Sequence, residues 1–391
     1  MEILEGKYLK KRKKISRFFE WMLVFGLSLI RFLAGWRPRC RFPREARSVL
    51  VIRHNQLGDA VAASAFIQAL QDLLPGATLD VAAGPANAEV FSWIPGVTHV
   101  HCLPVTEWGR LRYYWSLRQR YDLVFQTLLD ESYWKRLLGA RVAASRGILV
   151  ARARGSCLEK LAEYPVYLPA GSYVGKLMAL LRPLTAMDVA ALVQQYPAHV
   201  LKLPIENLAT AQSKIQAAGL APDRLIALNI SAREAFRALS VEQAAVLARV
   251  LCDFGQQPLI WFSPADFSLA KQVQALEPRA VCLRWDSLAE SMAALRLVKL
   301  YVGPDTGTAH FAAAAGVPCV VLFAPQARPD VWSPYGVFFI SVQAGRSQAV
   351  SQLPVELISR QIWRLLQGER CTEIIPMQPL RYFPVVSVPE K

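Results

Sequence analysis

Residues 48–74 read SVLVIRHNQLGDAVAASAFIQALQDLL, and this stretch decides the fold class. Its apolar first part, residues 48–53, is typical of a buried strand, and a polar turn separates it from the helical spacing of apolar side chains in residues 59–74. A proline and a glycine follow directly and end the helix. Strand, turn and helix in this order form one βα unit, which is the repeating element of a parallel sheet.

The same alternation of strands and helices recurs along the chain. In the N-terminal half the further predicted strands are 78–82, 98–103 and 123–126, with a helix at 110–120. In the C-terminal half the predicted strands are 225–230, 258–262, 281–283, 299–303 and 318–323, and the predicted helices are 241–254, 268–276, 288–295 and 308–315. This pattern predicts two Rossmann-like, doubly wound α/β domains that face a cleft, with ligands beyond the carboxyl ends of the strands.

An irregular segment with three prolines, residues 187–223, interrupts the alternation, although residues 206–218 within it have helical spacing. We place the domain boundary here, because a chain of 391 residues is long enough for two cores. The predicted parts are an N-terminal segment, an acceptor domain, a donor domain and a C-terminal tail, at residues 1–47, 48–200, 201–367 and 368–391.

The formal net charge of +15 is concentrated at the N-terminus. Residues 1–48 contain thirteen Lys and Arg against four Glu, and the basic block 7–17 runs into residues 18–36, which are rich in Phe, Trp, Leu and Ile. A basic arm followed by an apolar helix favours an anionic membrane surface, and charges within the apolar run lead us to expect that residues 1–40 lie in the interface. A solvated tail with a helix packed on the body and a signal peptide are the alternatives.

The cysteines and histidines form no cluster in the sequence. Seven cysteines are scattered without a C-x-x-C pair, and the five histidines are dispersed. This pattern fits a reducing cytoplasm and predicts neither a disulfide framework nor a metal site. We therefore expect a cytoplasmic protein on the inner face of the membrane that uses no metal and no cofactor. Nothing resembles a nucleic-acid-binding module, so no nucleic-acid partner is predicted.

The turn after the first strand reads H-N-Q-L-G-D and holds the first candidate residues. Gly58 permits a close approach of the backbone, and Asp59 lies at the start of a helix, where exposed amides favour an anion. Serving as the N-cap of that helix is a sufficient structural role for Asp59, and acting as a general base is the functional alternative. Asn55 and Gln56 complete the predicted acceptor loop.

A second turn, P-D-T-G-T-A-H, follows the strand that ends at Gly303. The first amides of the helix that begins here predict an anion site, and the glycine in the turn lets a phosphate come close. An ordinary capped helix is the structural alternative, and the histidine is either a phosphate donor or a structural residue. The candidate residues of this turn are Asp305, Thr306, Gly307, Thr308 and His310.

Together, and one in each domain, these turns resemble glycosyltransferase family 9, the family of the lipopolysaccharide core heptosyltransferases. The L-G-D pattern matches residues 57–59, and the D-[ST]-G-x-x-H pattern matches residues 305–310. Residues 229–239 and 322–336 are similar to two further stretches of the family, so that the resemblance covers residues 48–336. It implies a GT-B fold and an inverting, metal-independent glycosyltransferase.

The resemblance also implies a role for each candidate residue. Asp59 matches the family's proposed general base, which takes the proton from the acceptor hydroxyl. The amides at the start of the second turn's helix would hold the donor diphosphate, and Arg233 or Arg237 would neutralise the leaving group. Asp266 falls where the family carries an acid that binds the nucleoside. The implied partners are a nucleotide-sugar donor such as ADP-heptose and a lipopolysaccharide core or other lipid-linked glycan acceptor.

The sequence departs from the family pattern in two places. Many relatives carry Lys-Arg-Trp-Pro where this chain has F-R-A-L at residues 236–239, and Gly-Pro-Thr where it has A-P-Q at residues 324–326. An Arg can donate to phosphate in place of the missing Lys. A sugar-nucleotide epimerase and an inactive sugar-nucleotide-binding protein are the alternative functions. The aromatic and basic residues 108–121 predict an amphipathic helix with a solvated face, or else a contact for an anionic acceptor.

Overall fold

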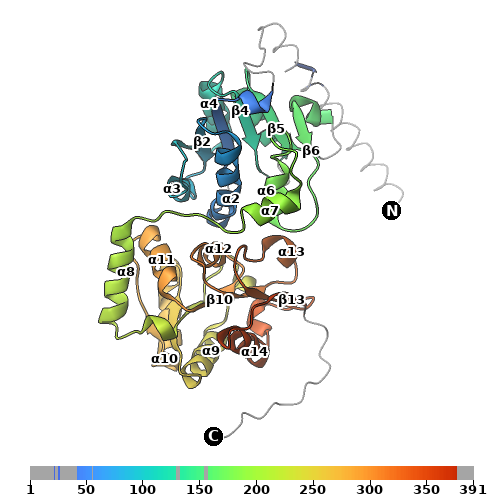
Figure 1. The fold of residues 1–391 in the computed structure, drawn as a ribbon. Coiled ribbons are helices and arrows are strands. Elements are labelled where there is room, and N and C mark those ends of the chain that lie inside the picture. The colour runs from blue at the N-terminus through green and yellow to red at the C-terminus, as the bar shows by residue number, and fades with distance from the viewer. Residues whose placement is uncertain are drawn as a thin grey trace. The chain divides into compact units, whose positions relative to one another are not determined.

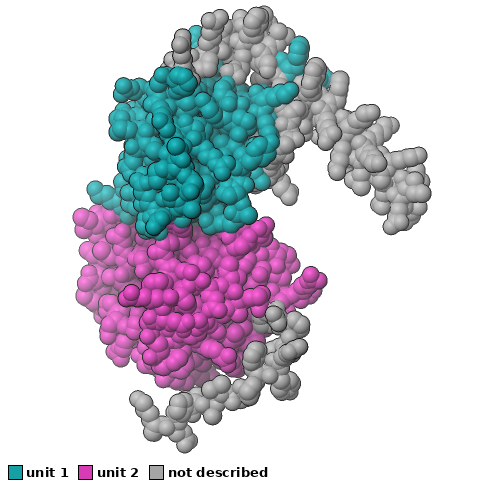
Figure 2. Space-filling view, turned by 45° about the vertical axis from the view of Figure 1, so that its right-hand side comes forward, with its two compact units in different colours: residues 1–202 teal, residues 203–391 magenta. Residues whose placement is uncertain are grey.

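The computed structural model describes residues 42–54, 56–128, 133–153 and 157–376, together with Met22, Phe25 and Gly26. The chain forms two compact units, Met1–Lys202 and Leu203–Lys391, which Figure 2 colours separately. Apart from those three isolated residues, the predicted membrane-surface segment lies outside the described part of the chain. No helix in the described part is long and apolar enough to cross a membrane.

Unit 1 is a parallel sheet with helices on both faces (Figure 1). Its strands are β1 (Ser48–Arg53), β2 (Thr78–Ala83), β3 (His99–Cys102), β4 (Leu123–Gln126), β5 (Ile148–Arg152) and β6 (Tyr164–Val166). Its helices are α2 (Leu57–Leu73), α3 (Ala88–Ser92), α4 (Glu107–Leu117), α5 (Tyr133–Ala143), α6 (Tyr173–Ala179) and α7 (Val189–Gln195). The strand order β3-β2-β1-β4-β5-β6 is that of a Rossmann fold.

Successive side chains of β1 point to opposite faces of the sheet and so contact two different helix layers. Leu50 and Ile52 are fully buried in a core that also contains Tyr114 and Leu117 of α4 and residues of α5. The helices α2 and α6 pack against one another in a separate layer. The last residue of β1, Arg53, contacts side chains of both α2 and α6 and so belongs to this second layer.

Unit 2 repeats this design with a seven-stranded parallel sheet in the order β13-β12-β11-β10-β7-β8-β9. Its strands are β7 (Leu225–Asn229), β8 (Gln257–Trp261), β9 (Val281–Cys282), β10 (Leu300–Pro304), β11 (Cys319–Phe323), β12 (Phe339–Gln343) and β13 (Thr372–Pro376). Its helices are α8 (Ile205–Ala217), α9 (Val241–Asp253), α10 (Phe267–Leu276), α11 (Leu288–Ala294), α12 (Gly307–Ala314), α13 (Pro329–Trp332) and α14 (Val355–Leu366).

Two helix layers cover the sheet of unit 2 in Figure 1. The core on one face joins Ile226, Val302 and Val320 of the strands to apolar residues of α9, α10 and α14. The helices α8 and α11 pack together in the other layer. The last strand, β13, corrects the sequence analysis, which assigned residues 368–391 to a tail. The strand reads T-E-I-I-P, and only Glu373 and Ile375 of it are half-buried while the other three residues are exposed, so it gave no strong apolar signal.

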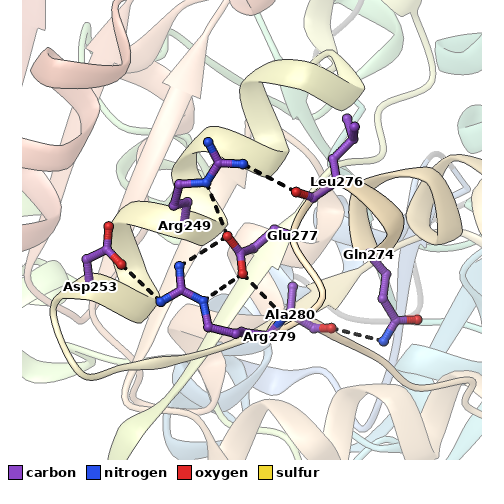
Figure 3. A network of polar contacts seen from close by, with 7 residues as sticks. All are labelled: Arg249, Asp253, Gln274, Leu276, Glu277, Arg279 and Ala280. Atoms are coloured by element: carbon purple, nitrogen blue, oxygen red, sulfur yellow. Dashed lines mark hydrogen bonds and ion pairs between the residues drawn. The ribbon is translucent and has the colours of Figure 1, made fainter.

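A network of charged side chains ties α9 to the end of α10 (Figure 3). Glu277 is almost fully buried and accepts hydrogen bonds from Arg279 Nε at 2.7 Å and Arg249 Nε at 3.3 Å. Arg279 also donates to Asp253 at 3.0 Å. The bonds from Arg279 lower the pKa of Glu277 to about 2. These residues lie away from the predicted turns, and their role is structural.

The predicted α/β fold class is confirmed. Two of the predicted strands, β1 and β4, have the bounds that the sequence analysis gave them, and most other predicted elements differ by one or two residues at their ends. The two compact units divide after Lys202, whereas the sequence analysis placed the domain boundary after residue 200.

Candidate active site

Both predicted turns lie where the strand order of their sheet reverses. In unit 1, β1 lies between β2 and β4, and the first turn leaves its carboxyl end. In unit 2, β10 pairs with both β7 and β11, and the second turn leaves its carboxyl end. Adjacent loops diverge at such a switch point, and open α/β sheets bind their ligands there. Each unit therefore has one candidate site at this position.

Asp59 is a buried carboxylate at the start of α2. One of its oxygens, Oδ2, accepts a hydrogen bond from the backbone N–H of Gln56 at 3.0 Å, which caps the helix. The other oxygen, Oδ1, lies 2.5 Å from Arg53 Nη2. The sequence analysis expected Asp59 to be the N-cap, but the helix begins at Leu57, Gln56 is the N-cap, and Asp59 is the third helical residue, whose side chain bonds back to the N-cap amide. It did not anticipate the ion pair with the last residue of β1.

Arg53 is held from three sides. Its side chain is 2% exposed, and Nη1 donates to the carbonyl oxygen of Thr127 at 2.8 Å. Its guanidinium carbon lies 4.9 Å from the centre of the Tyr173 ring, in a cation–π arrangement. Asp59 supplies the third contact and the balancing charge. A buried arginine thus fixes the position of the proposed base, although the sequence presented Arg53 only as the end of a strand.

The remaining residues of the first turn are partly described. Gln56 is exposed and Gly58 is buried, while Asn55 lies outside the described residues. The buried Asn87 donates to the carbonyl oxygens of Arg53 at 3.3 Å and Gln56 at 3.4 Å, and so ties the turn to the loop after β2. The sequence analysis missed Asn87, because no local pattern marks a side chain that supports a turn 31 residues away.

The backbone of the first turn also packs tightly against the end of β2. A Cβ atom added to Gly84 would lie 2.7 Å from the carbonyl oxygen of His54, so only glycine fits without movement. The side chain of His54 also has a neighbour, because its Nε2 lies 3.1 Å from Arg110 Nη1 of α4. The turn is therefore positioned by its neighbours on both sides.

In unit 2, α12 begins directly after the second turn with open amides. Thr306 is the N-cap residue, and its side chain accepts no hydrogen bond from the first amides of the helix. Amides that lack an intrahelical partner at a helix start attract anions. Gly307 and Thr308 are both half-buried, while His310 is buried with its ring centre 6.0 Å from that of Trp332.

Asp305 and Arg237 form an ion pair next to these amides. Arg237 Nη2 lies 2.8 Å from Asp305 Oδ2 and also donates to the carbonyl oxygen of Asp305. Burial raises the pKa of Asp305 to about 6, and the attraction of Arg237 opposes that rise. The ion pair places a cation beside the helix start, which is favourable for a bound anion. Arg233, the other candidate cation, is exposed.

Beneath the second turn lies a polar contact that sequence reasoning missed. The buried Asn229, at the end of β7, donates to Tyr301 Oη at 2.9 Å and to Thr306 Oγ1 at 3.3 Å. A Cβ atom at Gly303 would lie 2.7 Å from Asn229 Cβ, so the two strands approach closely here. Asn229 thus supports the turn from the neighbouring strand, and Tyr301 gave no signal because it reads as an ordinary strand residue.

Asp266 belongs to the same edge of the sheet. Its Oδ2 accepts hydrogen bonds from Ser231 Oγ and Ser263 Oγ, both at 2.6 Å. The serines come from the loops after β7 and β8, so this carboxylate joins two loops. The loop after β11 is stabilised from the neighbouring strand β12, where Gln343 donates a hydrogen bond to the carbonyl oxygen of Pro325 at 3.2 Å.

The structure therefore brings together three of the four motif stretches. Hydrogen bonds connect the loops after β7, β8 and β10 through Asn229, Arg237 and Asp266, and β11 lies directly beside β10. At this edge of unit 2, the amides of α12 and the guanidinium of Arg237 can bind an anion. The carboxylate of Asp266 can accept hydrogen bonds from hydroxyl groups. Within the part of the chain that the structure describes, no three His, Cys, Asp or Glu residues lie so that they could hold a metal ion.

Comparison with known proteins identifies the fold and the family. The sequence model of glycosyltransferase family 9 (heptosyltransferase) matches residues 112–353. No curated protein sequence matches the chain. Among solved structures, a family 9 glycosyltransferase from Veillonella parvula is similar with a TM-score of 0.70 and 16% identity, over 82% of this chain and 97% of that one.

Two Escherichia coli structures are also similar. ADP-heptose lipopolysaccharide heptosyltransferase II has a TM-score of 0.63 and 21% identity, over 82% of this chain and 99% of its own. Heptosyltransferase WaaC with ADP has a TM-score of 0.61 and 18% identity, over 83% and 99%. At these identities the likeness establishes the fold, and it confirms the GT-B type that the sequence predicted.

Proposed function

The chain belongs to glycosyltransferase family 9, the heptosyltransferase family, and we propose that it transfers a heptose or a related sugar from a nucleoside-diphosphate donor to a lipopolysaccharide core or another lipid-linked glycan. The observation that carries the proposal is the match to this family over residues 112–353, together with the open amides and ion pair at the carboxyl edge of unit 2. ADP-heptose is the first donor to test, because one similar E. coli protein is an ADP-heptose lipopolysaccharide heptosyltransferase and the structure of the other, WaaC, is one with ADP.

In this proposal unit 2 binds the donor. The diphosphate lies on the first amides of α12, at Thr306, Gly307 and Thr308, where the helix dipole and the N–H groups favour negative charge. Arg237 beside them stabilises the charge that grows on the leaving nucleoside diphosphate. Asp266, fixed by two serines, accepts hydroxyl groups of the nucleoside. Arg233 is exposed and is the weaker of the two candidate cations.

Asp59 acts as the general base of the reaction that we propose. The acceptor hydroxyl gives its proton to the carboxylate while its oxygen forms the bond to the anomeric carbon, and the bond from that carbon to the diphosphate breaks with both electrons on the leaving group. Each carboxylate oxygen has two lone pairs, so Asp59 can accept a proton while Arg53 and the Gln56 amide hold it. Asn55, Gln56 and Gly58 are the proposed acceptor loop.

We further propose that the enzyme works at the inner face of the cytoplasmic membrane, attached through residues 1–40. The basic block of residues 7–17 supports this proposal, because each Lys or Arg near an anionic surface contributes about 1 kcal/mol to binding. The adjoining residues 18–36 would add apolar contact with the acyl boundary. A membrane-bound enzyme would then share a surface with a lipid-linked acceptor.

Turnover and donor binding test the proposal separately. Purified protein is incubated with ADP-heptose, UDP-sugars and a lipopolysaccharide acceptor, and consumption of each donor is measured. Asp59→Asn should slow transfer by about 100- to 10,000-fold and leave donor affinity unchanged. Gly307→Val should abolish donor binding in calorimetry with an unchanged circular dichroism spectrum. Donor binding without turnover in the wild-type protein would instead identify an inactive sugar-nucleotide-binding protein, and wild-type turnover by Asp59→Asn would refute the base.

A further inference from the structure

The outward face of α4 carries tryptophan where a surface helix normally carries polar residues. The inward face of α4 is formed by Tyr114 and Leu117, which are 4% and 2% exposed. Trp108, Arg112 and Trp115 are spaced by four and three residues, so they lie in one stripe on the opposite side. Trp108 is 83% exposed and Trp115 is 48% exposed. The predicted amphipathic helix is therefore present, but its solvated face is aromatic.

Just before α4, the apolar side chain of Val105 is 73% exposed as well. Single exposed apolar side chains are normal, whereas a contiguous group that points away from the core marks a contact surface. We call the residues Val105, Trp108, Arg112 and Trp115 the α4 face. None of these four side chains belongs to the buried core of unit 1.

The charge around the α4 face is strongly positive. Residues 105–120 contain four arginines and one glutamate. Arg118 places its guanidinium 4.5 Å from the centre of the Trp115 ring and donates to the Trp115 carbonyl oxygen at 2.8 Å. The surface thus combines amphipathic aromatic rings with cations, which is the composition found where proteins meet the headgroup region of a bilayer.

We infer that the α4 face docks on an anionic lipid surface. The stripe is the convex outer side of a helix, and its two tryptophans are separated by roughly 10 Å along the axis at 1.5 Å per residue. A flat bilayer interface can contact both rings at once, whereas sugar and small-molecule sites are concave. Arg118 also covers one face of the Trp115 ring, which leaves only the other face of that ring for stacking against a sugar.

The α4 face is a candidate contact in addition to residues 1–40, and it lies on the helix whose Arg110 contacts His54 of the first turn. Two attachment points would fix the orientation of unit 1 on the membrane, whereas a single attachment point would fix only its distance. The inference does not depend on the identity of the sugar or of the acceptor, because it concerns contact with the lipid surface itself.

Vesicle binding by the full-length protein tests the inference. The probes are phosphatidylcholine vesicles with and without phosphatidylglycerol, and vesicles of the anionic mixture with brominated acyl chains that quench nearby tryptophan. The double variant Trp108→Ala/Trp115→Ala should bind the anionic vesicles about tenfold more weakly, since two partly buried aromatic rings are lost. The matched control is Trp363→Ala on α14, whose side chain is 44% exposed and should leave binding unchanged.

A second readout locates the contact independently of affinity. Trp108→Phe/Trp115→Phe keeps aromatic rings but removes the two indoles, so it should bind vesicles and show less quenching by brominated lipid than the wild-type protein. Unchanged affinity of the alanine variant together with unchanged quenching of the phenylalanine variant would overturn the inference. Loss of transfer to a delipidated, water-soluble acceptor in the alanine variant would overturn it as well, because the face would then contact the glycan.

Discussion

Replacing Arg53 by methionine is the sharpest perturbation of unit 1. Methionine keeps much of the apolar stem but removes the charge, the bond to the Thr127 carbonyl oxygen and the contact with Tyr173. Asp59, whose side chain is 10% exposed, would keep only its helix-capping bond to Gln56. Removing one partner of a buried ion pair typically costs about 3–5 kcal/mol, so we expect the free energy of unfolding of unit 1 to fall by about that amount.

A double-mutant cycle separates the ion pair from the other contacts of Arg53. Asp59→Asn keeps an oxygen for the helix cap and removes the negative charge, so Arg53→Met should cost less in that background. The difference between the two backgrounds is the coupling energy, which we expect to reach about 2 kcal/mol or more. Arg53→Lys is the matched control, because it keeps the charge and loses the forked geometry, and its cost should be smaller.

Hydrogen exchange of β1 and α2 under increasing urea measures these effects within unit 1. Global unfolding is less suitable, because a chain with two units need not unfold in one step. A loss below about 1 kcal/mol for Arg53→Met, or additive effects in the cycle, would show that the 2.5 Å contact does not stabilise the native state as argued.

Three further predictions concern pH and the backbone. Because burial raises the pKa of Asp305 to about 6, its ionisation as the pH rises from 5 to 7 places negative charge beside the anion site. Calorimetry with an intact nucleotide sugar should therefore show weaker binding at the higher pH, and Asp305→Asn should abolish that dependence. Since the pKa of Glu277 is lowered to about 2, its stabilising effect is complete above its ordinary value of 4.5 and disappears as the pH falls towards 2. Glu277→Gln should thus lower stability at pH 7 by about 1–3 kcal/mol, and a difference in urea midpoint that does not shrink at acid pH would contradict this sign. Gly84→Ala should displace the His54 carbonyl and reduce kcat/KM for transfer while far-ultraviolet circular dichroism stays unchanged.

The local sequence determined the elements that carry the candidate site. Apolar runs such as residues 48–53 and 319–323 are buried on both faces of a sheet, so their composition alone marks them as strands of a parallel sheet. Turn residues between strand and helix then placed both candidate turns at the carboxyl ends of strands. The order of the motifs identified the family, and the match over residues 112–353 confirms it. The functional roles of the individual site residues remain predictions.

Only the tertiary structure decided which side chains support those turns. Arg53 reaches Asp59 across a turn, Asn87 reaches the same turn from the loop after β2, and Asn229 reaches Thr306 across 77 residues. Such contacts depend on the order of strands in the sheet, and that order does not follow from the composition of any one strand. The exposed side of α4 was also determined by tertiary packing. The spacing of its residues predicts a stripe along the helix, but packing against α5 and the sheet determines which side of the helix faces solvent. Local patterning therefore fixed the elements, and the long-range packing of the two sheets fixed the partners of each candidate residue.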